Sequence, residues 1–200
     1  DARLKAHRST PEGIVTLLGS LPDTTHPMVA LQSAVSALAA YYPHFEVEDS
    51  AKNEEAIIRM IACFPTIVAT FDRLRKGKEV LAPNADLDHA ANFLYMLNGE
   101  IPDEKQRRII DVALVLHAEH GFNASTFTGR VVGSTTANPY GSLSAAVGSL
   151  SGPLHGGANE RVLHMLAEID GGVDGVEPWF TQAVAEKRKI MGLGHRVYKV

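Results

Sequence analysis

Histidines are the residues of this sequence best suited to chemistry, and three segments hold them among small or glycine-rich neighbours. The segments are His-Ala-Glu-His-Gly-Phe-Asn at 117–123, Gly-Pro-Leu-His-Gly-Gly-Ala-Asn-Glu at 152–160 and Gly-Leu-Gly-His-Arg-Val-Tyr-Lys at 192–199. Small neighbours leave room for a ligand to reach an imidazole, which can donate or accept a proton near neutral pH. One such histidine alone is most simply a hydrogen-bonded structural residue, but three together favour a substrate site.

His155 has the most informative surroundings. Gly156 and Gly157 follow it and predict unusual backbone angles, while Asn159 is expected to be a helix N-cap with Glu160 in the first turn. A histidine just before a helix feels the positive end of the helix dipole, which disfavours the imidazolium form. A neutral ring there could donate a hydrogen bond to a carbonyl that is becoming an enolate. The alternative is a loop histidine that merely fills a turn.

His117 and His120 lie three residues apart near the end of an expected helix and share roughly one face. Such a pair could bind zinc, so a zinc hydrolase is one alternative. The metalloprotease pattern, with histidines four residues apart and a glutamate next to the first, is absent. We therefore expect no metal, and His117 could equally be a buried histidine on the apolar side of its helix.

His195 is preceded by Gly192 and Gly194 and followed by Arg196 and Lys199. Glycines let the backbone approach a ligand, and the two cations would suit a phosphate or a carboxylate. The glycine pattern is too short for a dinucleotide-binding fingerprint. A solvated basic pair is the simpler explanation of Arg196 and Lys199.

Apolar residues that recur at steps of three and four predict that helices position these histidines. The stripes are Met28, Leu31, Val35, Leu38 and Tyr42; Ile57, Ile61, Phe64, Val68 and Phe71; Leu87, Ala90, Ala91 and Leu94; Ile110, Ala113, Leu114 and His117; and Val162, Met165, Leu166 and Ile169. Pro65 should kink the second helix, and the pair Gly171-Gly172 should end the last.

Capping patterns and small residues add three further expectations. Ser9-Thr10 should cap a helix that has Pro11 in its first turn, and Pro102-Asp103-Glu104 should open a helix that runs to His120. The segment 126–136 is rich in Thr and Val but alternates poorly, so we expect a helix rather than a strand. The residues of 141–149 are nearly all small, which allows a tight contact inside the monomer or against a partner chain.

Composition excludes several classes of protein. The 200 residues include 45% hydrophobic and 21% charged residues, which excludes a disordered chain, and no apolar run is long enough to cross a membrane. The single cysteine, Cys63, excludes a disulfide framework and favours a reducing compartment. A net charge of −4 and 6% aromatic residues argue against nucleic-acid binding.

The three histidine segments together resemble the citrate synthase family. Gly-Pro-Leu-His-Gly-Gly-Ala-Asn at 152–159 is similar to the family signature, Gly-His-Arg-Val-Tyr-Lys at 194–199 to its second histidine motif, and 117–126 to its third. The order and spacing agree, and the resemblance covers nearly the whole chain. Within the family, the chain most resembles the shorter bacterial and archaeal enzymes, a group that includes 2-methylcitrate synthases.

The resemblance implies an all-α, multi-helical fold and a cytoplasmic homodimer. Residues 1–155 would be part of a large helical domain with the dimer-interface helices, and 156–200 the start of a small one, with the active site in the cleft between them. Acetyl-CoA would condense there with oxaloacetate, with the coenzyme A thioester as co-substrate and no permanently bound cofactor. No nucleic acid or membrane partner is implied.

The resemblance also assigns roles to residues. His155 would donate to the thioester carbonyl as it enolises, His195 would polarise the keto carbonyl of oxaloacetate, and His120 would help hold oxaloacetate. Coenzyme A would be contacted by Ile190, Met191, Gly192, Leu193, Gly194 and Lys199. The family's base aspartate and most of its carboxylate-binding arginines lie farther along, so we expect residues 1–200 to be a central piece of the enzyme, inactive alone.

Two alternatives to citrate synthase stay open at this point. A 2-methylcitrate synthase, which uses propionyl-CoA, shares the three histidines. A citrate-synthase-like helical protein that binds without turnover is the other.

Overall fold

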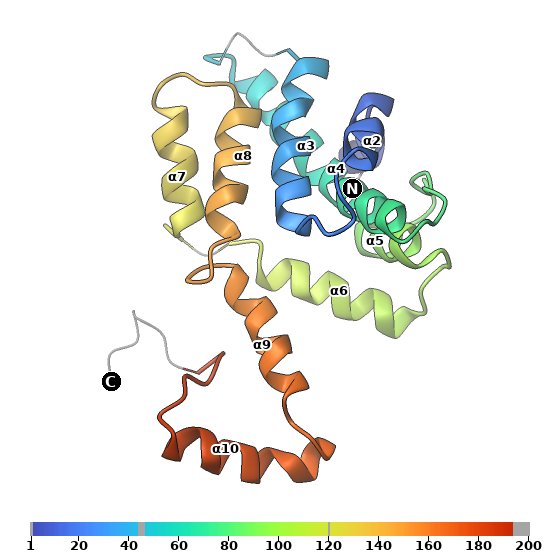
Figure 1. Cartoon of the computed structure of the whole chain (residues 1–200). Helices are drawn as coiled ribbons and strands as arrows, with labels where there is room; N and C mark the ends of the chain where they lie inside the picture. Colours follow the sequence, from blue (N-terminus) through green and yellow to red (C-terminus); the bar gives the residue numbers. More distant parts are fainter. Residues whose placement is uncertain (1, 44–46, 120, 194–200) are drawn as a thin grey trace. The chain divides into compact units, whose positions relative to one another are not determined.

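The computed structural model describes residues 2–43, 47–119 and 121–193, and all regular structure in these residues is helical, which confirms the expected all-α class. The helices in chain order are α1 Ala2–Ala6, α2 Glu12–Gly19, α3 Pro27–Tyr41, α4 Ser50–Arg75, α5 His89–Asn98, α6 Glu104–Leu116, α7 Ala124–Gly133, α8 Pro139–Leu150, α9 Gly157–Ala167, the 3₁₀ turn Gly172–Gly175 and α10 Val176–Ala185 (Figure 1). None of the helices in the described part of the chain is long and apolar enough to cross a membrane.

The chain divides into two compact units, Asp1–Gly148 and Ser149–Val200. The division falls within the last turn of α8, whereas the sequence analysis places the domain boundary after His155. The first unit contains the hydrophobic core, and the second contains α9, the 3₁₀ turn and α10.

Helix α4 is the centre of the first unit, because it contacts α1, α2, α3 and α5. Its buried side includes Met60, Cys63, Ile67 and Phe71. Around them pack apolar residues of α2, α3 and α8, namely Ile14, Leu18, Ala30, Leu31, Ala34, Val35, Leu38, Tyr140 and Val147. Burial of this surface is the main favourable term for folding of the unit.

The apolar stripe predicted for α4 is confirmed at Phe71, which is buried, and at Phe64 and Val68, which pack against the core, but it is wrong at its N-terminal end. Ile57 and Ile61 are 50% and 49% exposed, and the buried side begins one residue earlier, with Ala56 and Met60. In the N-terminal half of α4, Ala56 and Met60 take the buried positions instead of the two isoleucines. Helix α4 also continues through Pro65 without a break.

Two predicted helix boundaries are also wrong. Helix α2 starts at Glu12 with Pro11 as its N-cap and without a capping side chain, so Ser9-Thr10 does not cap it. Helix α6 begins as predicted, with a reciprocal capping box between Asp103 and Gln106, but it ends at Leu116 rather than at His120. None of its residues is buried, so no packing supports a further turn.

Helices α7 and α8 confirm the two helices expected in 126–136 and 141–149, although α7 ends at Gly133. Figure 1 shows α7, α8 and α3 side by side. The small residues allow close contacts inside the chain. A Cβ on Gly148 would come within 2.6 Å of the Gln32 side chain in α3, and a Cβ on Gly129 in α7 would lie 3.6 Å from the Ser142 carbonyl in α8.

Candidate active site

His155 lies in the tight turn that joins α8 to α9, in the second unit. The turn is closed by backbone hydrogen bonds from the His155 and Gly157 N–H groups to the Gly152 carbonyl, at 2.9 and 3.2 Å. The His155 carbonyl accepts a 3.0 Å hydrogen bond from the Ala158 N–H. The imidazole is half-buried. This turn fixes where the His155 backbone sits relative to the start of the helix.

The glycines after His155 are required by close backbone contacts rather than by unusual angles. Gly156 has ordinary helical angles, φ −61° and ψ −30°, so the predicted conformation is wrong. A Cβ on Gly156 would lie 2.7 Å from the Leu150 carbonyl, and a Cβ on Gly157 would lie 2.8 Å from the Ser151 carbonyl. Any side chain at either position would therefore push His155 away from the end of α8.

Helix α9 starts closer to His155 than the sequence analysis expects. Its first residue is Gly157 and its N-cap is Gly156, so Asn159 is inside the helix and not its cap. Glu160 lies in the first turn, as predicted. His155 directly precedes the N-cap of α9.

The segment expected to contact coenzyme A lies against the same helix. Gly192 adopts φ +88°, a left-handed conformation that favours glycine, and a Cβ there would be 3.7 Å from Val162 of α9. The Met191 N–H lies 3.3 Å from the sulfur of Met165. Of the predicted site residues, the structure thus places His155 and Ile190, Met191, Gly192 and Leu193 around α9.

Four predicted site residues, His120, Gly194, His195 and Lys199, lie outside the described residues. His117 is exposed rather than buried, and its Nδ1 lies 2.7 Å from the Ala113 carbonyl. Among the described residues, no three His, Cys, Asp or Glu side chains gather as they would around a metal ion.

A group of ionisable side chains lies at the start of α5 in the first unit. Burial acts to raise the pKa of Asp88, but hydrogen bonds from the Ala91 N–H and Arg107 hold it below its ordinary value. Burial, and then the charge of Arg8, lower the pKa of His89, against a smaller opposing effect of Asp88. We interpret this cluster as structural, because Arg107 joins the first turn of α6 to the N-cap of α5.

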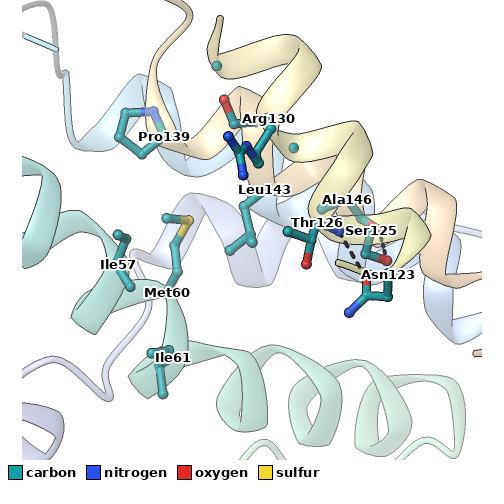
Figure 2. A pocket seen from close by; sticks show the side chains of 13 residues that line it. Ile57, Met60, Ile61, Asn123, Ser125, Thr126, Arg130, Pro139, Leu143 and Ala146 are labelled. Carbon is teal, nitrogen blue, oxygen red and sulfur yellow. Dashed lines mark hydrogen bonds between the residues drawn. The ribbon is translucent and has the colours of Figure 1, made fainter. Parts of the chain in front are cut away.

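The first unit also holds an open groove of about 820 Å³ between α4, α7 and α8 (Figure 2). Its lining residues are Ile57, Met60, Ile61, Asn123, Ser125, Thr126, Gly129, Arg130, Gly133, Pro139, Ser142, Leu143 and Ala146. The sequence analysis placed Ile57 and Ile61 in the core and so missed them as groove residues. Two large apolar side chains on an exposed face of α4, next to a helix of small residues, are the signal that could have indicated these groove residues.

More exposed apolar side chains of α7 lie near this groove. Phe127 and Val131 are 56% and 50% exposed, and Phe122, just before the helix, is 61% exposed. Phe127 meets Phe122 edge to face, and the Arg130 guanidinium lies 5.2 Å from the centre of the Phe122 ring. Large apolar surface of this kind, with few charges, is typical of an interaction site.

The entire chain is similar to known proteins. The family model "Citrate synthase, C-terminal domain" matches residues 1–200. Citrate synthase of Deinococcus radiodurans is 49% identical over 100% of this chain and 52% of its own length. 2-Methylcitrate synthase of Mycobacterium tuberculosis is 44% identical over 98% of this chain and 49% of its own length.

This chain is also similar to a solved structure. Citrate synthase from Thermotoga maritima superimposes with a TM-score of 0.79 at 39% identity, over 98% of this chain and 51% of that one. The chain thus spans about half the length of the relatives it matches. The family model covers all 200 residues, and the chain therefore belongs to the citrate synthase family.

Proposed function

We propose that the protein is a citrate synthase, an acyltransferase that condenses acetyl-CoA, oxaloacetate and water to give citrate and CoA for the tricarboxylic acid cycle. The observation that carries the proposal is the position of His155, held by a glycine-rich turn directly before α9. The 49% identity to a citrate synthase supports the same reaction.

We assign the three histidines different roles in the reaction. His155 donates a hydrogen bond to the thioester carbonyl while the family's base aspartate takes a proton from the methyl group, because a donor at that oxygen stabilises the charge it gains as the enolate forms. His195 polarises the keto carbonyl of oxaloacetate, and His120 helps bind the substrate. The enolate carbon then bonds to the keto carbon, and water hydrolyses the resulting thioester to release CoA.

The coenzyme A thioester is a co-substrate in this proposal and not a bound cofactor. The adenine would lie along the backbone of Ile190, Met191, Gly192, Leu193 and Gly194, with Lys199 near a phosphate. Left-handed Gly192 supports this assignment, since a glycine there lets the backbone adopt a turn that other residues would adopt only with strain. Because the substrates are central metabolites, the proposal includes a cytoplasmic location.

Release of CoA tests the reaction. The protein in its natural full length is mixed with acetyl-CoA and oxaloacetate, and the free thiol of CoA is measured with a disulfide reagent while citrate is identified by mass spectrometry. We expect both products in equal amounts. Binding of oxaloacetate without release of CoA would support the non-catalytic alternative instead.

A 2-methylcitrate synthase is the second candidate, favoured by the 44% identity to the Mycobacterium tuberculosis enzyme. The two reactions differ by one methylene group on the acyl chain, which changes binding by a small amount. Comparison of kcat/KM for acetyl-CoA and propionyl-CoA decides between them. We expect acetyl-CoA to be preferred.

We also propose that the protein is a homodimer that pairs through the groove of α4, α7 and α8. The exposed Ile57, Ile61 and Phe127 support this, because a two-fold contact would bury them. Sedimentation of the full-length protein tests the proposal, and a monomer at micromolar concentration would contradict it.

A further inference from the structure

The segment after α10 turns back toward α9 within the second unit (Figure 1). Lys187 makes the reversal with φ +55°, and the Arg188 N–H bonds back to the Ala183 carbonyl at 2.8 Å. Three contacts with α9 then follow along residues 188–192. These contacts bear on the binding of coenzyme A, because residues 190–192 of this segment belong to the proposed adenine site.

The three contacts use one face of α9. Arg188 Nη1 lies 3.4 Å from Glu168 Oε2, the Met191 N–H lies 3.3 Å from the Met165 sulfur, and a Cβ on Gly192 would lie 3.7 Å from Val162. Val162, Met165 and Glu168 are spaced three residues apart and therefore share a helix face. Their partners follow one another along the chain in the reverse order, so the segment is antiparallel to α9.

The middle contact is the one that fixes the loop backbone. The ion pair of Arg188 with Glu168 is largely exposed, with side chains 41% and 55% accessible, and such pairs contribute little. The contact at Val162 is ordinary packing. Met165 is half-buried and accepts a hydrogen bond from the Met191 N–H, which holds the peptide group between Ile190 and Met191.

Helix α9 also connects this loop to His155. Eight residues separate Gly157 from Met165, which corresponds to about 12 Å along a helix. A ligand that reaches from the His155 turn to the 190–193 loop must therefore be long, as a CoA thioester is, and the helix fixes the separation of its two ends.

We propose that Met165 is a positioning residue for the acyl-CoA, which holds the Met191 peptide so that the 190–193 backbone can receive the adenine. This inference rests on the proposed function. It assigns no chemical step to Met165. It does predict that the sulfur matters for CoA binding and not for oxaloacetate binding or for the chemical step.

The test compares Met165→Leu with the wild type in the full-length protein. Leucine keeps the apolar volume but removes the acceptor, so the Met191 N–H loses its partner. We expect KM for acetyl-CoA to rise about three- to tenfold, with KM for oxaloacetate and kcat changed less than about twofold. Met165→Gln supplies an oxygen acceptor of similar reach and should restore KM for acetyl-CoA. His164→Gln, on an exposed side of the same helix, is the control and should change neither the two KM values nor kcat.

A second readout does not depend on turnover. Trp179 is the only tryptophan of the sequence, and the Arg188 guanidinium lies 4.9 Å from its ring centre, so its fluorescence reports on this segment. Titration with CoA should give a dissociation constant that rises in Met165→Leu by the same factor as KM. Thermal unfolding is measured alongside, and if Met165→Leu is unfolded, Met165→Gln carries the test against the wild type, with an unchanged CoA affinity as the expected result.

The outcomes separate the inference from the proposed function. An active wild type with the same acetyl-CoA KM and CoA affinity in Met165→Leu overturns the inference and leaves the function intact. A loss of oxaloacetate affinity equal to the loss of CoA affinity also overturns it, because that pattern indicates general damage. A wild type that makes no citrate overturns the function, and the CoA titration then decides the inference alone, with no binding by the wild type counting against it.

Discussion

His155 is the residue on which the proposed reaction depends most. We predict that His155→Ala lowers kcat of the full-length enzyme about 10²- to 10³-fold with a smaller effect on oxaloacetate binding, because the lost donor acts mainly in the transition state. Steady-state kinetics with both substrates measures the two effects. His120→Ala should instead weaken oxaloacetate binding at least as much as it slows turnover, and equal kinetics for the two variants would contradict this division of roles.

Cys63 should be chemically inert in the folded protein. It is 1% exposed, and burial raises its pKa to about 12. We predict that a disulfide reagent at pH 8 reacts with it only after unfolding in guanidinium chloride. Because the folded pKa is raised, the stability that Cys63 contributes is complete below the unfolded value near 9 and is lost as the pH rises toward 12. Rapid labelling of the native protein would show that the core opens.

His89 should make the first unit sensitive to acid. Its Nδ1 is buried without a hydrogen-bond partner in the described structure, and burial and Arg8 lower its pKa. The stabilising contribution of neutral His89 is therefore present above the unfolded pKa of about 6.5 and is lost as the pH falls through the lower folded value. We predict that His89→Gln reduces the fall in Tm between pH 7 and pH 5, whereas exposed His164→Gln does not. An unchanged pH dependence would refute the assignment.

The start of a helix just after His155 could be predicted from the sequence, but its N-cap residue and its packing could not. His155 precedes a helix because Gly156 and Gly157 end the turn and good helix formers follow, and that is local information. The need for glycine comes from the backbone of Leu150, whose approach depends on where α8 ends. The contact of Met165 with Met191 links residues 26 positions apart, and no local pattern indicates it.

At the scale of elements, periodicity predicted which segments are helical but not always which side is buried. For α3 the prediction is confirmed, since Leu31, Val35 and Leu38 are buried. For α4 it holds at Phe71 but fails at Ile57 and Ile61, because a helix with apolar residues on two sides can pack by either, and Ala56 and Met60 are buried there instead. Which of the two sides is buried is decided by how the whole fold packs.

Helix α8 offers a test of the proposed dimer. Ala146 lines the groove, and its Cβ is 3.7 Å from where a Cβ on Gly129 would lie. We predict that Ala146→Leu overpacks this contact and weakens the dimer by about 1–3 kcal/mol. Sedimentation equilibrium over a range of concentrations measures the change. Ala40→Leu, at an exposed alanine of α3 outside the groove, is the matched control and should leave the dimer intact; equal dissociation constants for the two variants would contradict the proposal.

At the scale of the whole molecule, histidines alone are not sufficient for the proposed reaction. Removal of a weakly acidic methyl proton needs a carboxylate base within about 2.6–3.2 Å of it. The family resemblance assigns that base to an aspartate farther along than residue 200, and the relatives are about twice as long as this chain. The enolate must also be shielded from water while it forms, which requires a finished small domain.

We therefore predict that a polypeptide of residues 1–200 makes no citrate, although it contains all three histidine segments. It should still bind oxaloacetate weakly, because His120 and His195 are present. The measurement is CoA release by this polypeptide beside that of the full-length enzyme, with circular dichroism to establish that both are folded and the His155→Ala version of the polypeptide as a control for contaminating enzyme. Turnover above that control would mean that a carboxylate within residues 1–200 serves as the base, and the roles assigned from the family would have to be revised.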